Sequence, residues 1–181
     1  MVRGMMIYSN NMEDGEALLT RDLLLRSGLQ IDSVSLTTRE IKTALGLRVI
    51  ADYLFSEISL NEYKFLVVPG GRYVGEIIEK DTMIKKVVNE FYNEKKLIAA
   101  ICAAPRFLGQ LGLLDGRRFT CFPGCEKDMK KGIHLPNEKA VFDSNIITGR
   151  SVGTVIEFSA LIVSKLVSED AAKNLLKEIV Y

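Results

Sequence analysis

The sequence predicts an α/β protein with a mostly parallel central sheet and helices on both of its faces. Short apolar runs alternate along the chain with longer segments in which apolar residues recur at helical spacing. Two of these runs, KFLVV at 64–68 and LIAAI at 97–101, have few polar residues, as expected for parallel strands that are buried on both faces. This alternation of strands and helices favours parallel βαβ units.

The predicted strands are short and mostly apolar. They lie at residues 2–8, 31–36, 45–51, 64–68, 97–101, 118–121, 140–142 and 146–148. The patterns at 118–121 and 140–142 are the weaker ones, and the segment 122–139 between them is irregular and rich in Gly, Pro and Lys. Irregular segments of this kind often border a functional site.

The predicted helices lie at residues 14–27, 102–113, 154–167 and 171–180, with a further amphipathic helix at 82–94. The first helix begins with acidic side chains and has Arg26 in its last turn, which suits the helix dipole, and Gly28 supplies a C-cap. In the segment 82–94 the apolar residues recur at helical spacing, at Ile84, Val87, Val88 and Phe91.

Length and composition fit one domain that spans residues 1–181. The 24 Lys and Arg residues nearly balance the 23 Asp and Glu residues, so the net charge is +1, and charge does not favour a nucleic-acid partner. The apolar run near the N-terminus is too short for a signal peptide or a membrane span. We therefore expect a soluble, cytoplasmic protein that does not associate with a membrane and whose three cysteines are free thiols.

Three chemically useful features directly follow predicted strands. Glu16 lies near the start of the helix after the first strand, Gly70 and Gly71 follow the KFLVV strand, and Cys102 follows the LIAAI strand. In open parallel sheets, ligands bind at the carboxyl ends of the strands. The sequence therefore predicts that a carboxylate, a glycine turn and a thiol meet at one edge of the sheet.

Cys102 has the sequence setting of a nucleophile on a tight strand-to-helix turn. Small residues flank it, as such a turn requires. A cysteine at a helix N-terminus has a lowered pKa, so we expect an acidic thiol. The backbone N–H groups of Ala103 and Gly71 would form an oxyanion hole for an attacked carbonyl group.

Each of these features also has a purely structural interpretation. A cysteine at the end of a buried strand is often a small apolar side chain. Pro-Gly-Gly after a strand is usually a turn, and Glu16 taken alone would be an exposed carboxylate at a helix start. The combination and its order along the chain favour a functional site.

At these residues the sequence resembles the ThiJ/PfpI superfamily, and within it the branch of the Parkinson-disease-associated deglycase. The resemblance is carried by AAICAAP at 99–105, by VVPGG at 67–71 and by EDGEALL at 13–19. It extends to FPGCEKDM at 122–129 and ITGRSVGT at 147–154, and so covers about residues 2–180.

The resemblance implies a flavodoxin-like three-layer sandwich with a nucleophile elbow, usually assembled as a homodimer and needing no cofactor. The reactive cysteine would be Cys102, hydrogen-bonded by a protonated Glu16, with Gly71 and Ala103 as the oxyanion-hole amides. Members of this branch are described as glyoxalases or deglycases that act on small aldehydes and glycated adducts. Others are described as redox sensors or oxidative-stress chaperones.

The chain departs from the family pattern where a histidine usually lies near the cysteine. This position is Phe122, which removes the obvious general base and a Cys–His–acid triad. The single histidine, His134, does not match the motif, and we expect it at the surface or at a dimer edge. Members of the family often have an asparagine after Gly-Gly, and this chain has Arg72 at that position. Gly70, Arg72, Phe122 and Arg150 are the pocket candidates.

Cys121 and Cys125 lie in the irregular segment that should border Cys102. We expect no metal, because three cysteines and one poorly placed histidine supply too few ligands. The favoured interpretation is that both are small buried side chains in a loop. A disulfide between one of them and Cys102 under oxidation is the alternative.

These observations lead to one main functional hypothesis and two alternatives. The first is a cofactor-free, cysteine-dependent glyoxalase or deglycase that acts on small reactive aldehydes or glycated thiols and amines. The second is an oxidative-stress sensor or redox-regulated chaperone in which Cys102 is oxidised and catalyses little. The third, an amidotransferase-like or peptidase-like hydrolase, is disfavoured because it needs a histidine paired with the cysteine.

Overall fold

The central sheet has seven strands, and their spatial order places the predicted elbow strand beside the middle one. In this order they are β10 (Ala140–Asp143), β11 (Ile146–Gly149), β7 (Leu97–Ile101), β6 (Phe65–Val68), β1 (Arg3–Tyr8), β2 (Gln30–Ser35) and β5 (Tyr53–Leu54). Neighbouring strands are parallel except for the antiparallel pair β10–β11. The computed structural model describes residues 2–181.

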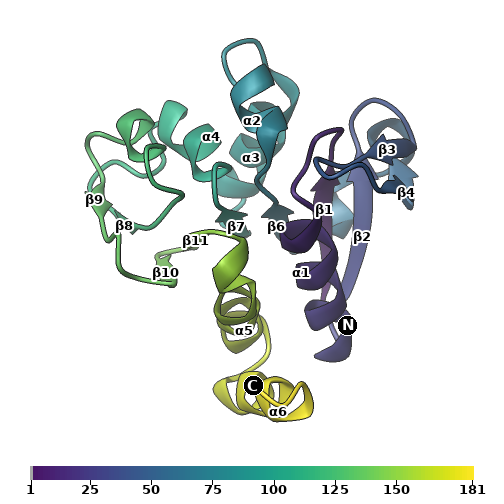
Figure 1. The fold of residues 1–181 in the computed structure, drawn as a ribbon, viewed down its shortest axis with the longest axis vertical. Helices are drawn as coiled ribbons and strands as arrows, with labels where there is room; N and C mark the ends of the chain where they lie inside the picture. The colour runs from purple at the N-terminus through teal and green to yellow at the C-terminus, as the bar shows by residue number, and fades with distance from the viewer. Residues whose placement is uncertain (1) are drawn as a thin grey trace.

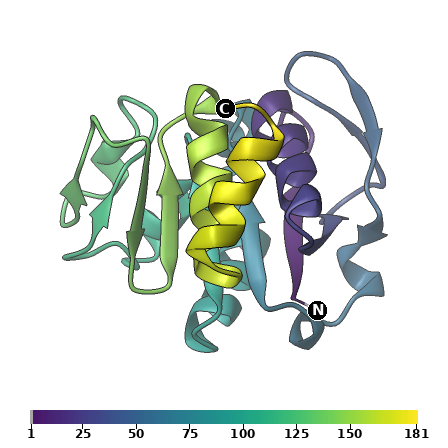
Figure 2. The same ribbon diagram turned by 90° about the horizontal axis from the view of Figure 1, so that it is seen from below.

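Helices cover both faces of this sheet and complete three layers (Figures 1 and 2). Helices α1 (Asp14–Arg26) and α5 (Val155–Leu166) pack side by side on one face, and α6 (Glu169–Glu178) packs against α5. Helices α3 (Met83–Asn93) and α4 (Pro105–Gln110) lie on the other face together with the short α2 (Arg72–Ile77). The predicted α/β architecture with a mostly parallel sheet is confirmed.

The apolar runs of the sequence become the buried centre of the sheet. All four residues of β6 are buried, and in β7 only Leu97 is partly exposed. Strands enclosed on both faces have no solvent side, which explains why these runs do not alternate with polar residues. This rigid centre carries the turns that follow β6 and β7.

Two small pairs of strands lie outside the central sheet. The antiparallel pair β3 (Glu40–Lys42) and β4 (Arg48–Ile50) replaces the strand expected at 45–51. The parallel pair β8 (Arg118–Phe119) and β9 (Ile133–His134) replaces the strand expected at 118–121. Strand β5 and helix α2 were not expected, since both are short and have no extended pattern.

The helix expected from residue 102 begins later and ends earlier, as α4 at Pro105–Gln110. The reason is the backbone of Cys102, which has a φ of 64° and cannot be part of a right-handed helix. Proline at the first helical position suits this start, because its missing N–H would have no intrahelical partner there. The elbow and the helix are therefore separate local structures.

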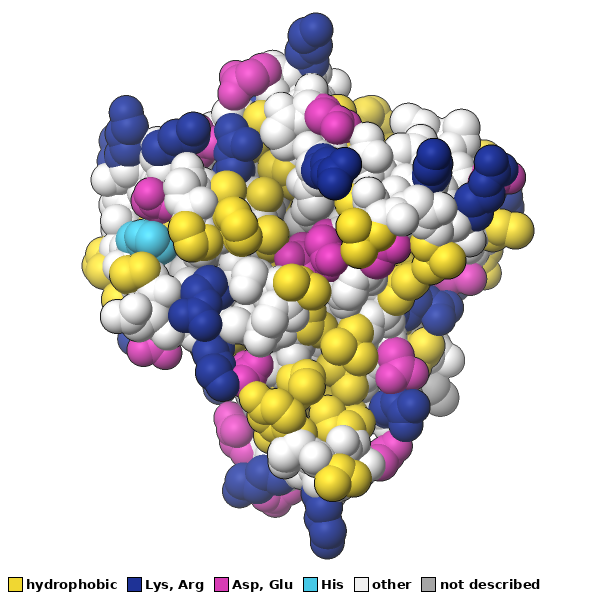
Figure 3. Space-filling model, in the orientation of Figure 1, with side chains coloured by type: hydrophobic (Ala, Val, Ile, Leu, Met, Phe, Trp, Pro, Cys, Tyr) yellow, Lys and Arg dark blue, Asp and Glu magenta, His cyan; other side chains and the backbone are white. Residues whose placement is uncertain are grey.

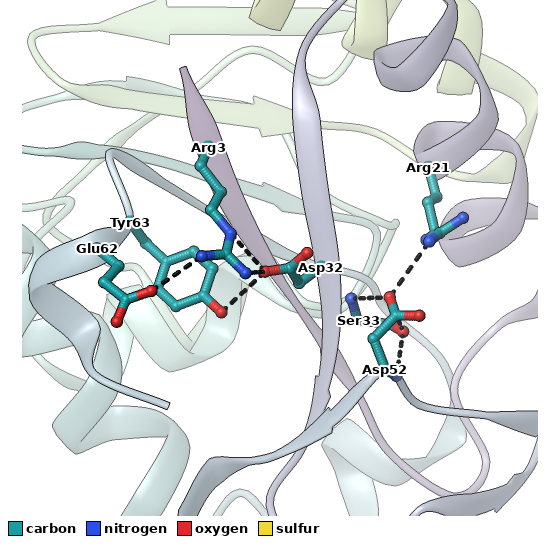
Figure 4. A network of polar contacts seen from close by, with 7 residues as sticks. All are labelled: Arg3, Arg21, Asp32, Ser33, Asp52, Glu62 and Tyr63. Atoms are coloured by element: carbon teal, nitrogen blue, oxygen red, sulfur yellow. Dashed lines mark hydrogen bonds and ion pairs between the residues drawn. The ribbon is translucent and has the colours of Figure 1, made fainter. Parts of the chain in front are cut away.

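A polar network fixes the edge of the sheet at β1, β2 and β5 (Figure 4). Arg3 lies 2.7 Å from Asp32 Oδ2 and 2.9 Å from Glu62 Oε2, and the Tyr63 hydroxyl donates to Asp32 Oδ2 at 2.9 Å. The neighbouring Asp52 carboxylate accepts from the backbone N–H of Ser33 at 2.9 Å. These contacts join the segment around η2 (Leu60–Glu62) and the start of β5 to β2.

Among the described residues, none of the helices combines the length and the apolar character needed to cross a membrane.

Candidate active site at the strand-to-helix elbow

Cys102 occupies a strained turn directly after β7. Its φ of 64° lies in the left-handed region, which is unusual for a residue other than glycine and costs about 1 kcal/mol or more. Main-chain contacts on both sides hold it there. Its N–H donates to the Gly149 carbonyl at 2.9 Å, and its own carbonyl accepts from the Phe122 N–H at 2.8 Å. The chain thus fixes the thiol at the carboxyl end of the sheet.

Glu16 is the acidic partner at this turn, and it is buried although it carries a carboxyl group. Only 1% of the residue is exposed, because it lies in the first turn of α1 on the side that faces the sheet. Glu13 caps this helix by accepting from the Glu16 N–H at 2.6 Å. Glu16 Oε2 in turn accepts from the Gly70 N–H at 2.8 Å. Helix α1 and the turn after β6 therefore position the carboxyl group together.

The Glu16 carboxyl also interacts with the Cys102 thiol and with the backbone N–H of Val152. The buried Oε1 atom of Glu16 has no hydrogen-bond partner among the described residues. A proton held between the carboxyl group and the thiol would serve both groups. The geometry therefore fits a carboxyl–thiol pair that shares a proton.

The pKa values of the two groups follow from their burial. Burial raises the pKa of Glu16 to about 7, so the carboxyl holds its proton close to neutral pH. Burial also raises the pKa of the Cys102 thiol, the Glu16 carboxylate raises it further, and the N–H of Ala103 acts in the opposite direction. The expectation of an acidic thiol is therefore wrong, because burial is the largest of the causes that raise this pKa. The helix whose N-terminus was expected to lower the pKa of Cys102 begins only at Pro105.

Gly71 forms the turn beside the thiol and has a φ of 123°, where side chains are not tolerated. A Cβ at this position would lie 2.5 Å from the Asn11 carbonyl oxygen and 2.5 Å from the Glu13 nitrogen. Among the backbone hydrogen bonds of the described residues, the N–H groups of Gly71 and Ala103 have no carbonyl acceptor. Two N–H groups that no main-chain carbonyl occupies therefore lie on the turns that follow β6 and β7.

The other predicted pocket residues differ in how close they lie to the elbow. The Phe122 backbone N–H donates to the Cys102 carbonyl and the residue is 48% exposed, so Phe122 lies next to the elbow and is open to solvent. Arg72 follows Gly71 and is exposed. The Arg150 guanidinium lies against the segment 136–137, where it donates to the Asn137 carbonyl at 3.2 Å. This bond gives Arg150 a structural partner away from the elbow.

His134 lies beside Cys121, and its ring is partly buried. It stacks on Phe119 with the ring centroids 5.1 Å apart, and its Nε2 lies 3.9 Å from Cys121 Sγ. His134 therefore lies at the surface, as expected, but one side of its ring packs against Phe119. The structure has all three cysteines as free thiols.

Sequence reasoning missed two main-chain contributors to the site, Gly149 and Val152. The Gly149 carbonyl holds the Cys102 N–H, and the Val152 N–H contacts Glu16. Both lie in the segment ITGRSVGT, which supported the family resemblance but has no side chain that suggests chemistry. Only the parallel pairing of β11 with β7 shows that this segment reaches the elbow.

Comparison with known proteins agrees with this fold and elbow. The model of the DJ-1/PfpI family matches residues 3–165. The chain is 29% identical over 166 residues to Protein DJ-1 homolog B of Arabidopsis thaliana, covering 91% of this chain but only 38% of that longer protein. It is 28% identical to the glutathione-independent glyoxalase DJR-1.2 of Caenorhabditis elegans, covering 91% of this chain and 88% of the relative.

A third relative is a protein of Pyrococcus abyssi named as a deglycase, with 29% identity over 84% of this chain and 92% of the relative. Among solved structures, the C103A mutant of the DJ-1 superfamily protein STM1931 from Salmonella typhimurium superposes with a TM-score of 0.91 at 25% identity. This likeness covers 100% of this chain and 99% of that chain. The family match over most of the sequence confirms the resemblance, and the chain belongs to the DJ-1/PfpI family.

Proposed function

We propose that this chain is a cysteine-dependent, cofactor-free enzyme of glyoxalase or deglycase type that acts on small reactive aldehydes. The observation that carries the proposal is the contact between the strained Cys102 and a buried Glu16 whose pKa lies at about 7. A general acid or base works best when its pKa is near the working pH. The names of the relatives from Caenorhabditis elegans and Pyrococcus abyssi support this reaction class.

Glu16 takes the role that a histidine would otherwise have. The phenyl ring of Phe122 cannot accept a proton, whereas the Glu16 carboxyl group lies on the other side of Gly70 from the Cys102 side chain, close enough to influence the pKa of the thiol. As the sulfur attacks an aldehyde carbon, an S–C bond forms and the carbonyl π electrons move to oxygen. The thiol proton passes to Glu16, and the N–H groups of Gly71 and Ala103 stabilise the oxyanion.

For a dicarbonyl substrate the rest of the reaction needs no external oxidant. The carbon bonded to sulfur loses its hydrogen as a proton, and the neighbouring carbonyl carbon gains a proton. One carbon is thereby oxidised while the other is reduced, and the product is a thioester of a hydroxy acid. Water then cleaves the S–C bond and returns the Cys102 thiol. Glu16 is the group that carries the proton in each step.

The proposal is tested with methylglyoxal turnover by the wild type, Cys102→Ser and Glu16→Gln. We expect Cys102→Ser to be inactive, because the hydroxyl is a far weaker nucleophile without a strong base. Glu16→Gln keeps the size of the side chain but cannot move the proton, and kcat should fall about 10²- to 10⁴-fold. Turnover by Cys102→Ser at the wild-type rate would contradict the proposal.

Oxidation of Cys102 is a second candidate function, favoured by the partial exposure of this residue and by the Ala103 N–H beside the sulfur. Two molecules of hydrogen peroxide convert the thiol to a sulfinic acid and release two molecules of water. The Ala103 N–H and a protonated Glu16 would hydrogen-bond the new oxygens. Mass spectrometry after mild peroxide distinguishes this product from a disulfide. A Cys102-linked peptide in place of the sulfinate would contradict the sensor role in this form.

A further inference from the structure

Three side chains of kinds that bind metal ions cluster next to the elbow, outside the proposed catalytic pair. Cys121, Glu126 and His134 each offer one ligand atom, and these atoms lie within 4.8 Å of one another. Cys121 Sγ and His134 Nε2 are 3.9 Å apart. None of the three residues has a role in the chemistry proposed for Cys102 and Glu16.

The fold brings this trio together from three separate local structures. Cys121 follows strand β8, Glu126 begins the short 3-10 helix η3 (Glu126–Asp128), and His134 ends β9. The parallel β8–β9 pairing places Phe119 beside His134, and the stacking of their rings fixes the plane of the imidazole. The arrangement therefore depends on the tertiary fold and not on adjacency in the sequence.

The carboxyl group of Glu126 is also oriented by a neighbour. Its Oε2 accepts from the Gly124 N–H at 2.7 Å, and among the described residues no other residue hydrogen-bonds Oε1. Partners of this kind orient metal-binding side chains in proteins and strengthen metal binding. One oxygen of Glu126 is thus held by the backbone while the other remains available to a ligand.

The spacing suits a tetrahedral ion. With a metal–sulfur distance of about 2.3 Å and a metal–nitrogen distance of about 2.0–2.1 Å, tetrahedral geometry places sulfur and nitrogen about 3.5 Å apart. The observed 3.9 Å between Cys121 Sγ and His134 Nε2 needs only a small inward movement. A mixed set of sulfur, nitrogen and carboxylate oxygen is typical of zinc.

We propose that Cys121, Glu126 and His134 bind a zinc ion and leave a fourth coordination position for water or a small ligand. A thiolate and a carboxylate together balance the double positive charge of the ion. Cys121 is only 1% exposed and forms the floor of the site, while Glu126 and His134 are partly exposed. Figure 3 shows the single histidine side chain at the surface with an acidic side chain beside it, so the site is open to an entering ion.

This proposal departs from the sequence-based expectation of no metal. That expectation counted cysteines and the histidine, and it had no reason to include Glu126, which lies in the charged stretch EKD. The elbow is the competing site, because Cys102 and Glu16 also combine a thiol with a carboxyl group. The experiment therefore has to separate the two thiol sites.

The chain of residues 1–181 is first treated with a chelator and then titrated with Zn²⁺ in competition with a chromogenic chelator. Co²⁺ is used as a second probe, because tetrahedral coordination by a thiolate gives intense absorption bands that an octahedral aqua ion lacks. We expect one Zn²⁺ per chain and a tetrahedral Co²⁺ spectrum with sulfur-to-metal charge transfer. No Zn²⁺ binding tighter than about 10 μM would overturn the proposal.

Matched variants locate the ion. His134→Gln and Cys121→Ser should weaken Zn²⁺ binding at least about 100-fold, and Glu126→Gln, which can still accept from Gly124, about 10- to 100-fold. Cys102→Ser and Cys125→Ser should bind like the wild type. Unchanged affinity in His134→Gln, or loss of binding in Cys102→Ser, would place the ion elsewhere and overturn the proposal. Circular dichroism checks folding, and the more exposed positions 126 and 134 decide the result if Cys121→Ser does not fold.

Discussion

Glu16 and Cys102 meet across Gly70. A Cβ atom at Gly70 would lie 2.6 Å from Glu16 Oε2 and 2.7 Å from Cys102 Cβ, so only a glycine lets the two side chains approach from opposite sides. The same residue donates its N–H to Glu16 Oε2. The turn after β6 therefore controls both the spacing and the orientation of the carboxyl–thiol pair.

Replacing Gly70 should damage both stability and activity. In Gly70→Ala the new methyl group has to displace Glu16 or Cys102, and overpacking of this kind costs about 1–3 kcal/mol. We expect the free energy of unfolding to fall by this amount and methylglyoxal turnover to be lost.

Gly75→Ala is the matched control for this variant. A Cβ there has only Arg106 Nη1 near it, at 3.9 Å, and Gly75 lies inside α2, where alanine is the better helix former. The control should keep its activity and its stability. A Gly70→Ala protein with wild-type turnover would show that the close approach of Glu16 to Cys102 is not needed.

The strain at Cys102 can be measured with a pair of substitutions. Glycine adopts a positive φ freely, whereas alanine pays about 1–2 kcal/mol in the left-handed region, so Cys102→Gly should be more stable than Cys102→Ala by about 1 kcal/mol. Denaturant unfolding of both variants tests this. At the neighbouring Ala104, where φ is −62°, the change to glycine should destabilise the protein instead. Equal stabilities of the two Cys102 variants would argue that the elbow stores no strain.

The sequence was sufficient to predict the pairing of the main site residues because each follows its strand in a parallel sheet. Glu16, Gly70, Gly71 and Cys102 all lie at carboxyl ends of β1, β6 and β7, which are neighbours in the sheet. Local patterns of apolar residues determine those strands, and the parallel arrangement then brings their ends together. No further tertiary information was needed for this part of the site.

Other features depend on contacts that no local pattern encodes. Helix α4 starts late because Cys102 adopts a left-handed backbone conformation. Residues other than glycine rarely adopt this conformation, so a local sequence pattern does not predict it. His134 faces Cys121 because the two-residue strands β8 and β9 pair, and such short strands have no detectable periodicity. The raised pKa of Glu16 requires burial, whereas an acidic residue in a first helical turn is usually exposed.

Burial of Glu16 should make stability depend on pH in an unusual direction. Its pKa rises from 4.5 to about 7 on folding, so the folded chain binds more protons than the unfolded chain between these values. The contribution of Glu16 to the free energy of unfolding should therefore be greatest below about pH 4.5. It should fall by about 3 kcal/mol as the pH rises through 7.

Comparison with Glu16→Gln isolates this effect from other titrating groups. The amide has no proton to lose, so the difference in unfolding free energy between wild type and variant should change by about 3 kcal/mol between pH 4.5 and 8. Urea unfolding at several pH values gives this difference. Parallel stability profiles for the two proteins would mean that Glu16 titrates normally in the folded state.

Restoring a histidine at position 122 should increase turnover. The Phe122 backbone N–H contacts the Cys102 carbonyl, so the side chain can change without loss of that bond. An imidazole there, with a normal pKa near 6.5, would supply a second base beside the thiol and should raise kcat for methylglyoxal at least about tenfold. The plot of kcat against pH should also show an additional rise near pH 6.5. Phe122→Leu, which changes the ring but adds no base, should leave kcat near the wild-type value. If Phe122→His gains no more than Phe122→Leu, then Glu16 already supplies all the proton transfer that the reaction requires, and the missing histidine does not limit this site.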